Sequence, residues 1–201
     1  MYVKICGLRE PEHVHVAVDA GAHAVGVVMN RTSSRRATDD EAMAVVSAAG
    51  GRVDTVLVVN DMPAEDAARA ARRLGFDVLQ LHGPAYGPAD FATALAIVPR
   101  VWRATSLSAD PSLRVGASGE EVLLLDSPSP GSGEQWDAST LAADAPEGTW
   151  LLAGGLAPDN VAAAVRSVRP WGVDVSSGVE TAPGRKDNDL ITAFVRAALT
   201  A

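Results

Sequence analysis

The sequence predicts a single-domain (β/α)₈ barrel of the TIM-barrel class spanning residues 1–201. Short β-rich runs alternate with Ala-rich helical stretches from one end of the chain to the other, which predicts parallel strands joined by right-handed crossovers. Eight such units in about 200 residues match the lower size limit of this barrel. A doubly wound open sheet is the main alternative, but the turn Cys6-Gly7-Leu8-Arg9 after the first strand lacks the glycine spacing of a dinucleotide-binding turn.

The expected elements follow in order along the chain. Eight strands are expected at Tyr2–Cys6, His23–Met29, Val53–Val59, Asp77–Leu81, Arg100–Ala104, Val122–Asp126, Thr149–Ala153 and Gly172–Val175. Helices are expected at Glu12–Asp19, Asp39–Ala49, Ala64–Leu74, Ala89–Ile97, Pro158–Val168 and Asn188–Leu199. The stretches after Ala104 and Asp126 are rich in Ser, Pro and Gly, so the helices there should be short or poorly marked.

The charge balance argues against nucleic acid as a partner. The chain has 17 basic and 25 acidic residues, a formal net charge of −8 and a pI near 4.9. Duplex binding needs clustered Lys and Arg that release counterions from phosphates, whereas the basic residues here are scattered. An anionic ligand would be repelled at long range, so its site must be built locally from backbone amides and a few basic side chains.

From its cysteine usage and hydropathy, we expect the chain to be cytoplasmic. The single cysteine, Cys6, excludes an intrachain disulfide and a zinc site of several thiolates. The four histidines show no metal-ligand spacing. The first residues lack the apolar stretch of a signal peptide, and no run approaches the roughly 18 apolar residues of a membrane span. We therefore expect no association with membranes.

Three reactive side chains are expected at the mouth of the barrel. Catalytic groups gather at the carboxyl ends of TIM-barrel strands, and residues two apart on a strand share a face. This alternation turns Lys4 and Cys6 of the first strand inward, together with Asp126 of the sixth and Asp174 of the eighth. One thiol and two carboxylates then form a candidate site for acid–base catalysis.

Cys6 and Asp126 each have a structural alternative. A lone cysteine is typically a small buried hydrophobe, and Asp126, two residues before Pro128, would also suit a turn that begins the next loop. In the catalytic interpretation, Lys4 on the same face lowers the pKa of the Cys6 thiol from about 8.5 toward neutrality. The three leucines before Asp126 predict that burial raises the pKa of its carboxyl group.

Two glycine-containing segments at consecutive strand ends resemble phosphate sites. They are Leu152–Leu156 after the seventh strand and Asp174–Glu180 after the eighth, and neither contains a basic residue. Glycines let the backbone approach an anion, and exposed amides supply hydrogen bonds. Phosphate binding after strands seven and eight recurs in TIM barrels. The residues expected to hold phosphate are Gly154, Gly155, Ser176, Ser177 and Gly178.

Further candidates lie in two other loops. Arg35 and Arg36 follow the second strand, and an arginine there suits a bidentate bond to a carboxylate. The alternative is a pair of solvated loop charges. His82 ends the fourth strand and is either a hydrogen-bonding group of the pocket or a cap on its loop.

Several motifs in one order carry a resemblance to a known family. They are Lys4-Ile5-Cys6-Gly7, Gln80-Leu81-His82-Gly83, Leu124-Leu125-Asp126-Ser127, Ala153-Gly154-Gly155-Leu156 with Asn160-Val161, and Gly172–Glu180 followed by Pro183-Gly184 and Lys186-Asp187. With this order and spacing, nearly the whole chain resembles the phosphoribosylanthranilate isomerase family of tryptophan biosynthesis.

The resemblance implies an Amadori rearrangement of N-(5-phosphoribosyl)anthranilate, a phosphorylated small molecule. It assigns Cys6 as general base, Asp126 as general acid and Arg35 as the group that holds the anthranilate carboxylate. It likewise assigns phosphate to the two glycine-containing segments, and places His82 and Asp174 at the same mouth. The imine nitrogen comes with the substrate, so neither a cofactor nor a metal is expected, and the protein should be a monomer or a homodimer.

The chain departs from the family pattern in two loops. The usual Ser-Pro-Arg becomes Ser33-Ser34-Arg35, with a second arginine behind it. The loop after Asp126, expected to lie over the substrate, has Ser129–Gly133 in place of the usual Gly-Gly-Thr-Gly. Substrate affinity and loop closure are the properties that these changes would affect.

Two rival functions share the predicted fold. A histidine-pathway or dual-specificity isomerase acts on a larger substrate with two phosphates. However, its first strand ends in an aspartate, and Asn60-Asp61-Met62-Pro63 offers no clear second phosphate loop. A non-catalytic barrel that binds a phosphorylated ligand would not need a thiol opposite an acid. Metal-dependent epimerases also share the fold, but the histidines offer no ligand set.

Overall fold

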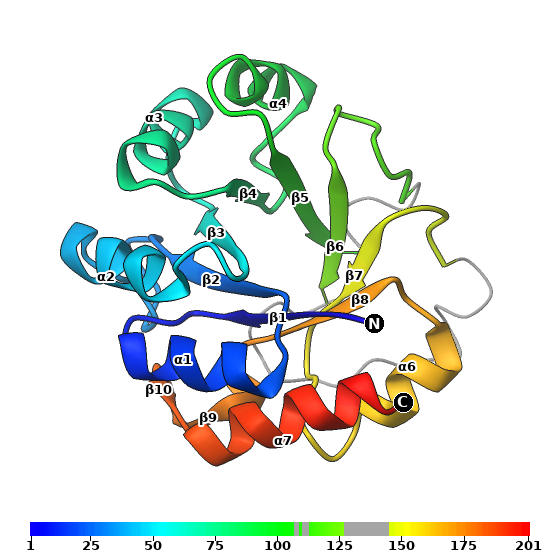
Figure 1. The fold of residues 1–201 in the computed structure, drawn as a ribbon. Coiled ribbons are helices and arrows are strands. Elements are labelled where there is room, and N and C mark those ends of the chain that lie inside the picture. The colour runs from blue at the N-terminus through cyan, green and yellow to red at the C-terminus, as the bar shows by residue number, and fades with distance from the viewer. Residues whose placement is uncertain (107–108, 110–112, 127–144) are drawn as a thin grey trace.

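Eight parallel strands form a closed barrel in sequence order, and the last strand pairs with the first (Figure 1). The computed structural model describes residues 1–106, 109, 113–126 and 145–201. The predicted TIM barrel is confirmed. Its strands are β1 (Tyr2–Cys6), β2 (Ala24–Val28), β3 (Asp54–Val59), β4 (Val78–His82), β5 (Val101–Ser106), β6 (Val122–Asp126), β7 (Trp150–Leu152) and β8 (Gly172–Val175).

All eight predicted strands are present, and only their ends differ. The fifth strand runs two residues beyond its predicted end at Ala104, because Ser106 pairs with Asp126 across the sheet. β4 likewise extends to His82, which pairs with Ala104. Backbone pairing with a neighbouring strand therefore carries His82 to the rim of the barrel, where the reactive groups were expected.

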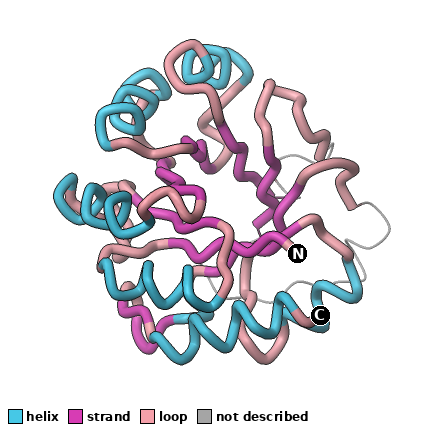
Figure 2. Tube along the Cα trace, viewed as in Figure 1, coloured by secondary structure: helices cyan, strands magenta, loops and turns pink. Residues whose placement is uncertain are grey.

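The helices lie outside the ring of strands (Figure 2). They are α1 (Pro11–Ala20), α2 (Asp39–Ala49), α3 (Ala64–Leu74), α4 (Pro88–Leu95), α6 (Val161–Val168) and α7 (Asn188–Leu199). α2 begins with a capping box, in which the Thr38 side chain accepts from the Glu41 amide, and ends at Gly50 in the left-handed conformation. In the described residues, every helix is too short or too polar to cross a membrane.

The predicted start of α6 at Pro158 is wrong. Residues 158–160 form a turn, and the helix begins at Val161. The Asn160 side chain explains the turn, because its Nδ2 donates to Gly155 O at 2.9 Å and its Oδ1 accepts from Ala157 N at 2.8 Å. These two bonds stabilise the loop after β7 instead of another helical turn.

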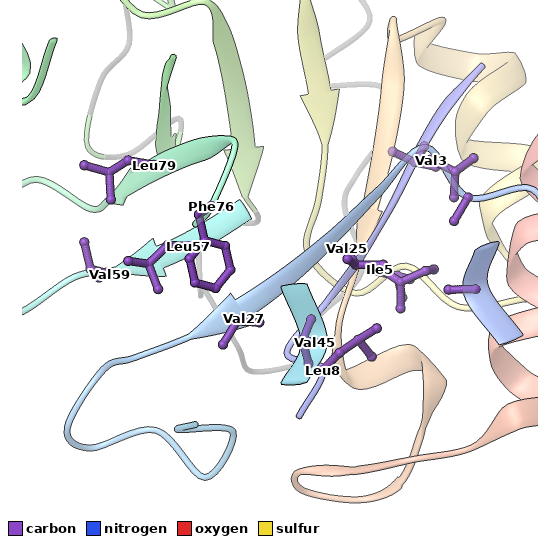
Figure 3. Packing of buried hydrophobic residues seen from close by; sticks show 14 of the residues in the cluster. Val3, Ile5, Leu8, Val25, Val27, Val45, Leu57, Val59, Phe76 and Leu79 are labelled. Atoms are coloured by element: carbon purple, nitrogen blue, oxygen red, sulfur yellow. The ribbon is translucent and has the colours of Figure 1, made fainter. Parts of the chain in front are cut away.

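Side chains alternate between two apolar layers, as the strand pattern predicts. One layer lies between the barrel and the helices and includes Val3, Ile5, Val25, Leu57 and Val59 (Figure 3). The second layer fills the barrel interior and contains Cys6, Ala24, Val28, Val56, Val58, Val78, Trp102, Ala104, Val122, Leu124, Leu151 and Ala153. Apolar side chains therefore fill most of the barrel below its mouth, and Lys4 and Gln80 are polar residues buried among the strands.

A small hairpin follows β8 that the sequence pattern did not predict. A short 3₁₀ turn, η1 (Ser177–Val179), leads into β9 (Glu180–Ala182), which pairs antiparallel with β10 (Arg185–Lys186). At its tip, Gly184 has φ +79°, and a Cβ there would lie 2.6 Å from the Ser34 carbonyl oxygen. The hairpin thus packs directly against the loop after β2, and glycine is required at the point of contact.

Candidate active site

A cavity of about 290 Å³ opens at the carboxyl ends of the strands. Nine of the ten site residues predicted from sequence line it: Cys6, Arg35, His82, Asp126, Gly154, Gly155, Asp174, Ser176 and Ser177. They come from loops and strands that lie far apart in the sequence, and the barrel brings them together. The substituted loop at 129–133 lies outside the described residues, so its expected position over the substrate stays a prediction.

A buried ion pair lies beneath the thiol. Lys4 is fully buried, and its Nζ donates to Asp174 Oδ1 at 2.8 Å. Burial opposes the ammonium charge, but the negative charges of the Asp174 carboxylate and of Cys6 in its thiolate form together outweigh this effect and raise the pKa of Lys4. Lys4 is therefore charged at neutral pH, and its charge is neutralised mainly by Asp174.

The thiol does not have the depressed pKa expected from sequence. Cys6 is only 6% exposed, and this burial raises its pKa by more than the Lys4 and Lys186 ammonium groups lower it. The Asp174 carboxylate also raises it. The prediction that Lys4 brings the pKa of Cys6 toward neutrality is wrong, because strand spacing turns Lys4 and Asp174 inward but reveals neither their ion pair nor the desolvation of the thiol.

Glycine on the neighbouring strand makes room for the thiol. A Cβ built on Gly26 of β2 would lie 2.9 Å from Cys6 Sγ and 3.2 Å from Lys4 Cε. Any larger residue at this position would displace one of these two side chains. β2 therefore contributes to the site through the absence of a side chain.

His82 and Asp126 face one another at the rim. His82 Nε2 lies 3.7 Å from Asp126 Oδ2, and the Asp126 side chain is largely buried. Burial lowers the pKa of His82, and the Lys4 ammonium lowers it further, more than Asp174 raises it. The imidazole is therefore neutral at neutral pH and does not act as the counterion of the Asp126 carboxyl group.

Arg35 reaches the cavity, whereas Arg36 is exposed to solvent outside it. Arg35 Nε and Nη2 donate to Glu180 Oε1 and Oε2 at 2.7 and 2.9 Å. A guanidinium has five N–H donors, so this fork leaves three for a ligand. The carboxylate partner of Arg35 fixes the plane of the guanidinium before any ligand binds.

Lys186 connects the hairpin to the loop after β8. Its Nζ donates to Ser176 O at 2.8 Å, to Ser176 Oγ at 3.2 Å and to Glu180 Oε1 at 2.8 Å. The sequence places no basic residue within this loop, yet β10 delivers one to it. Lys186 and Glu180 were both missed as individual site residues, and their only sequence signal was membership of the motifs that carried the family resemblance.

The two glycine-containing loops pack directly against each other. Gly154 and Gly155 have φ +81° and +65°, conformations that favour glycine. A Cβ on Gly178 would lie 1.9 Å from the Leu156 carbonyl oxygen. Gly178 is the one predicted site residue that does not line the cavity, and this contact gives it a packing role between the loops.

Gln80 lines the cavity and was not singled out from the sequence. It lies two residues before His82 on the same face of β4, and that spacing was the signal available.

Within the residues that the structure describes, no group of three or more His, Cys, Asp or Glu side chains is arranged to hold a metal ion.

Comparison with known proteins identifies the family. The family model described as N-(5′-phosphoribosyl)anthranilate (PRA) isomerase matches residues 3–197. The chain belongs to the PRA isomerase family. A curated family member from Haloferax volcanii is 40% identical, with 99% of this chain and 93% of that protein covered.

Solved structures of PRA isomerase family members agree with the fold. The crystal structure of TrpF from Jonesia denitrificans is 53% identical, with a TM-score of 0.92 and coverage of 99% of this chain and 97% of that one. A phosphoribosyl anthranilate isomerase in complex with reduced 1-(o-carboxyphenylamino)-1-deoxyribulose 5-phosphate is 30% identical, with a TM-score of 0.86 and full coverage of both chains.

Proposed function

We propose that this chain is the isomerase that converts N-(5′-phosphoribosyl)anthranilate into 1-(2-carboxyphenylamino)-1-deoxyribulose 5-phosphate in tryptophan biosynthesis. The observation that carries this proposal is the convergence of Cys6 and Asp126 in one cavity. Arg35 also lines that cavity, and so do the two glycine-containing loops. Family membership supports the same reaction.

Asp126 is the general acid in this proposal. It delivers a proton to the ring oxygen of the ribose as the bond between C1 and that oxygen breaks, which leaves an iminium ion on the anthranilate nitrogen. Proton transfer by a positioned group typically contributes 10²–10⁴-fold. A neutral His82 at 3.7 Å favours this role, because a charged imidazole would stabilise the carboxylate instead.

Cys6 is the general base. The iminium ion makes the proton on C2 acidic, and the Cys6 thiolate removes it to give an enolamine, which tautomerises to the ketone. The thiol then returns its proton to the Asp126 carboxylate, directly or through solvent, and the enzyme is reset. The nitrogen that carries the positive charge belongs to the substrate, so the proposed reaction needs no cofactor and no metal.

The two anionic ends of the substrate are held at different parts of the mouth. In the proposal, backbone amides of Gly154, Gly155 and Ser177, with Ser176, bind the phosphate, and Gly178 packs the two loops together. Arg35 binds the anthranilate carboxylate with the donors that Glu180 leaves open. The enzyme is expected to work in the cytoplasm as a monomer or a homodimer.

A turnover assay with purified protein tests this function. The protein should convert N-(5′-phosphoribosyl)anthranilate to the deoxyribulose product, as followed by chromatography. Comparable turnover of the two-phosphate substrate of histidine synthesis would identify a dual-specificity enzyme. Binding of the product analogue without turnover of either substrate would identify a non-catalytic barrel.

A further inference from the structure

A buried amide in the cavity has an oxygen without a hydrogen-bond partner. Gln80 is 1% exposed and lies on the inner face of β4, two residues below His82. Its Oε1 is one of two buried side-chain polar atoms that have no hydrogen-bond partner among the described residues. The other, Asn188 Oδ1, lies away from the cavity, whereas Gln80 lines it.

The residues paired with Gln80 across the sheet are apolar. Its neighbours in strand register are Val58 and Trp102, and the adjoining interior residues Val56, Ala104 and Leu124 are apolar. Buried polar side-chain atoms in native proteins are nearly always paired, with protein, water or ligand. An amide oxygen kept unpaired in an apolar wall therefore indicates a partner that arrives from the cavity.

The chemistry of the substrate restricts what that partner can be. This step rests on the proposed function. Phosphate and carboxylate groups are acceptors at neutral pH and cannot donate to Oε1, whereas a hydroxyl group both donates and accepts. The amine is attached to the anthranilate ring, which Arg35 holds at the outer end of the cavity. Gln80 lies two residues before the end of β4, which corresponds to about 6–7 Å along the strand.

We propose that Gln80 is a substrate-binding residue whose side-chain amide hydrogen-bonds a hydroxyl group of the sugar chain. The bond would hold the chain between its phosphate and its nitrogen while the C2 proton faces Cys6. It would also supply a donor for the unpaired Oε1, so the amide is satisfied only in the complex. Gln80 would thereby distinguish a polyhydroxylated chain from an apolar one.

Calorimetric binding of reduced 1-(o-carboxyphenylamino)-1-deoxyribulose 5-phosphate tests this role. Gln80→Met keeps the length of the side chain and removes both amide atoms. We expect its affinity for this product analogue to fall at least tenfold and kcat/KM to fall with it. Its thermal midpoint should equal or exceed that of the unaltered protein, because an unpaired buried polar atom is removed. A purely structural role for Gln80 predicts the opposite: lower stability and unchanged affinity.

A control variant and a second Gln80 variant complete the test. Asn188→Ala removes the other amide oxygen without a partner and should leave affinity for the analogue unchanged. If Gln80→Met does not fold, Gln80→Asn, which withdraws the amide by one methylene, should show the same tenfold loss. Unchanged affinity in the folded Gln80 variant overturns the inference. Absence of turnover and of analogue binding in the unaltered protein overturns the proposed function instead.

Discussion

Cys6 is held between opposing influences on its ionisation. Burial and the Asp174 carboxylate disfavour the thiolate, while the ammonium groups of Lys4 and Lys186 favour it, and burial is the largest effect. In the free protein the thiol is therefore protonated at neutral pH. The thiolate that the proposed base requires is therefore a minor form of the free protein.

The pH dependence of alkylation tests this state of Cys6. Because the chain has a single cysteine, iodoacetamide reports on this thiol alone. The pKa of Cys6 is raised, so the rate of alkylation should climb through a midpoint above the value of a free thiol, about 8.5. The product analogue, by filling the cavity, should slow the reaction. A midpoint below pH 8 would contradict the burial argument.

Arg35 and Arg36 form a natural pair of variant and control. Arg35→Ala should raise KM by an order of magnitude or more, because the proposed bidentate bond to the substrate carboxylate is lost. Arg36 is exposed and does not line the cavity, so Arg36→Ala should change KM less than twofold. Steady-state kinetics of the two variants show which arginine binds the substrate carboxylate. A larger effect from Arg36→Ala would show that the wrong arginine has been assigned.

At the scale of elements, the β9–β10 hairpin joins the two sides of the mouth. Glu180 accepts from Arg35 of the loop after β2 and from Lys186 of β10, and Lys186 in turn donates to Ser176 at the end of β8. Burial would raise the pKa of Glu180, but the hydrogen bonds from Arg35 and Lys186 outweigh it, and the pKa lies below its usual value.

The lowered pKa of Glu180 predicts that its contribution to folding stability depends on pH. A carboxyl group whose pKa is depressed by folding contributes stability above its unfolded pKa, about 4.3, and loses this contribution as the pH falls through its folded pKa. Glu180→Gln should therefore lower the free energy of unfolding by about 2 kcal/mol at pH 7. The difference from the unaltered protein should shrink below pH 4.

Denaturant unfolding at pH 7 and at pH 3.5 measures this effect. Glu65→Gln is the matched control, since Glu65 pairs with Arg69 on the exposed face of α3 and such pairs contribute little. If the two variants lose equal stability at pH 7, the Glu180 network is no stronger than a surface ion pair.

Elements with a clear period were predictable from the sequence, and those defined by distant contacts were not. The bounds of α2, α3 and α7 match the prediction because their apolar positions recur with helical spacing. The hairpin of two- and three-residue strands has no such period and depends on Gly184 meeting Ser34. α6 begins late because the Asn160 side chain bonds to Gly155 and Ala157 and stabilises the preceding turn.

At the scale of the whole molecule, the barrel explains why the site itself could be predicted. Alternation along the strands and the convergence of their carboxyl ends were enough to place Cys6, Asp126 and Asp174 in one cavity. The pKa of Cys6 was harder to predict. Burial has the largest effect on it and raises it, and burial is a property of the assembled barrel. Gln80 was missed because its unpaired oxygen becomes visible only once its neighbours are in place.

The account depends most on a proton that Asp126 transfers. Asp126→Asn keeps the shape of the side chain and removes the transferable proton, so kcat should fall by at least about 10²-fold, the lower range for a general acid. Affinity for reduced 1-(o-carboxyphenylamino)-1-deoxyribulose 5-phosphate should stay within about threefold, because Arg35 and the two loops proposed to bind phosphate are unaltered. An Asp126→Asn variant that turns over N-(5′-phosphoribosyl)anthranilate at the rate of the unaltered protein would show that another group opens the ring.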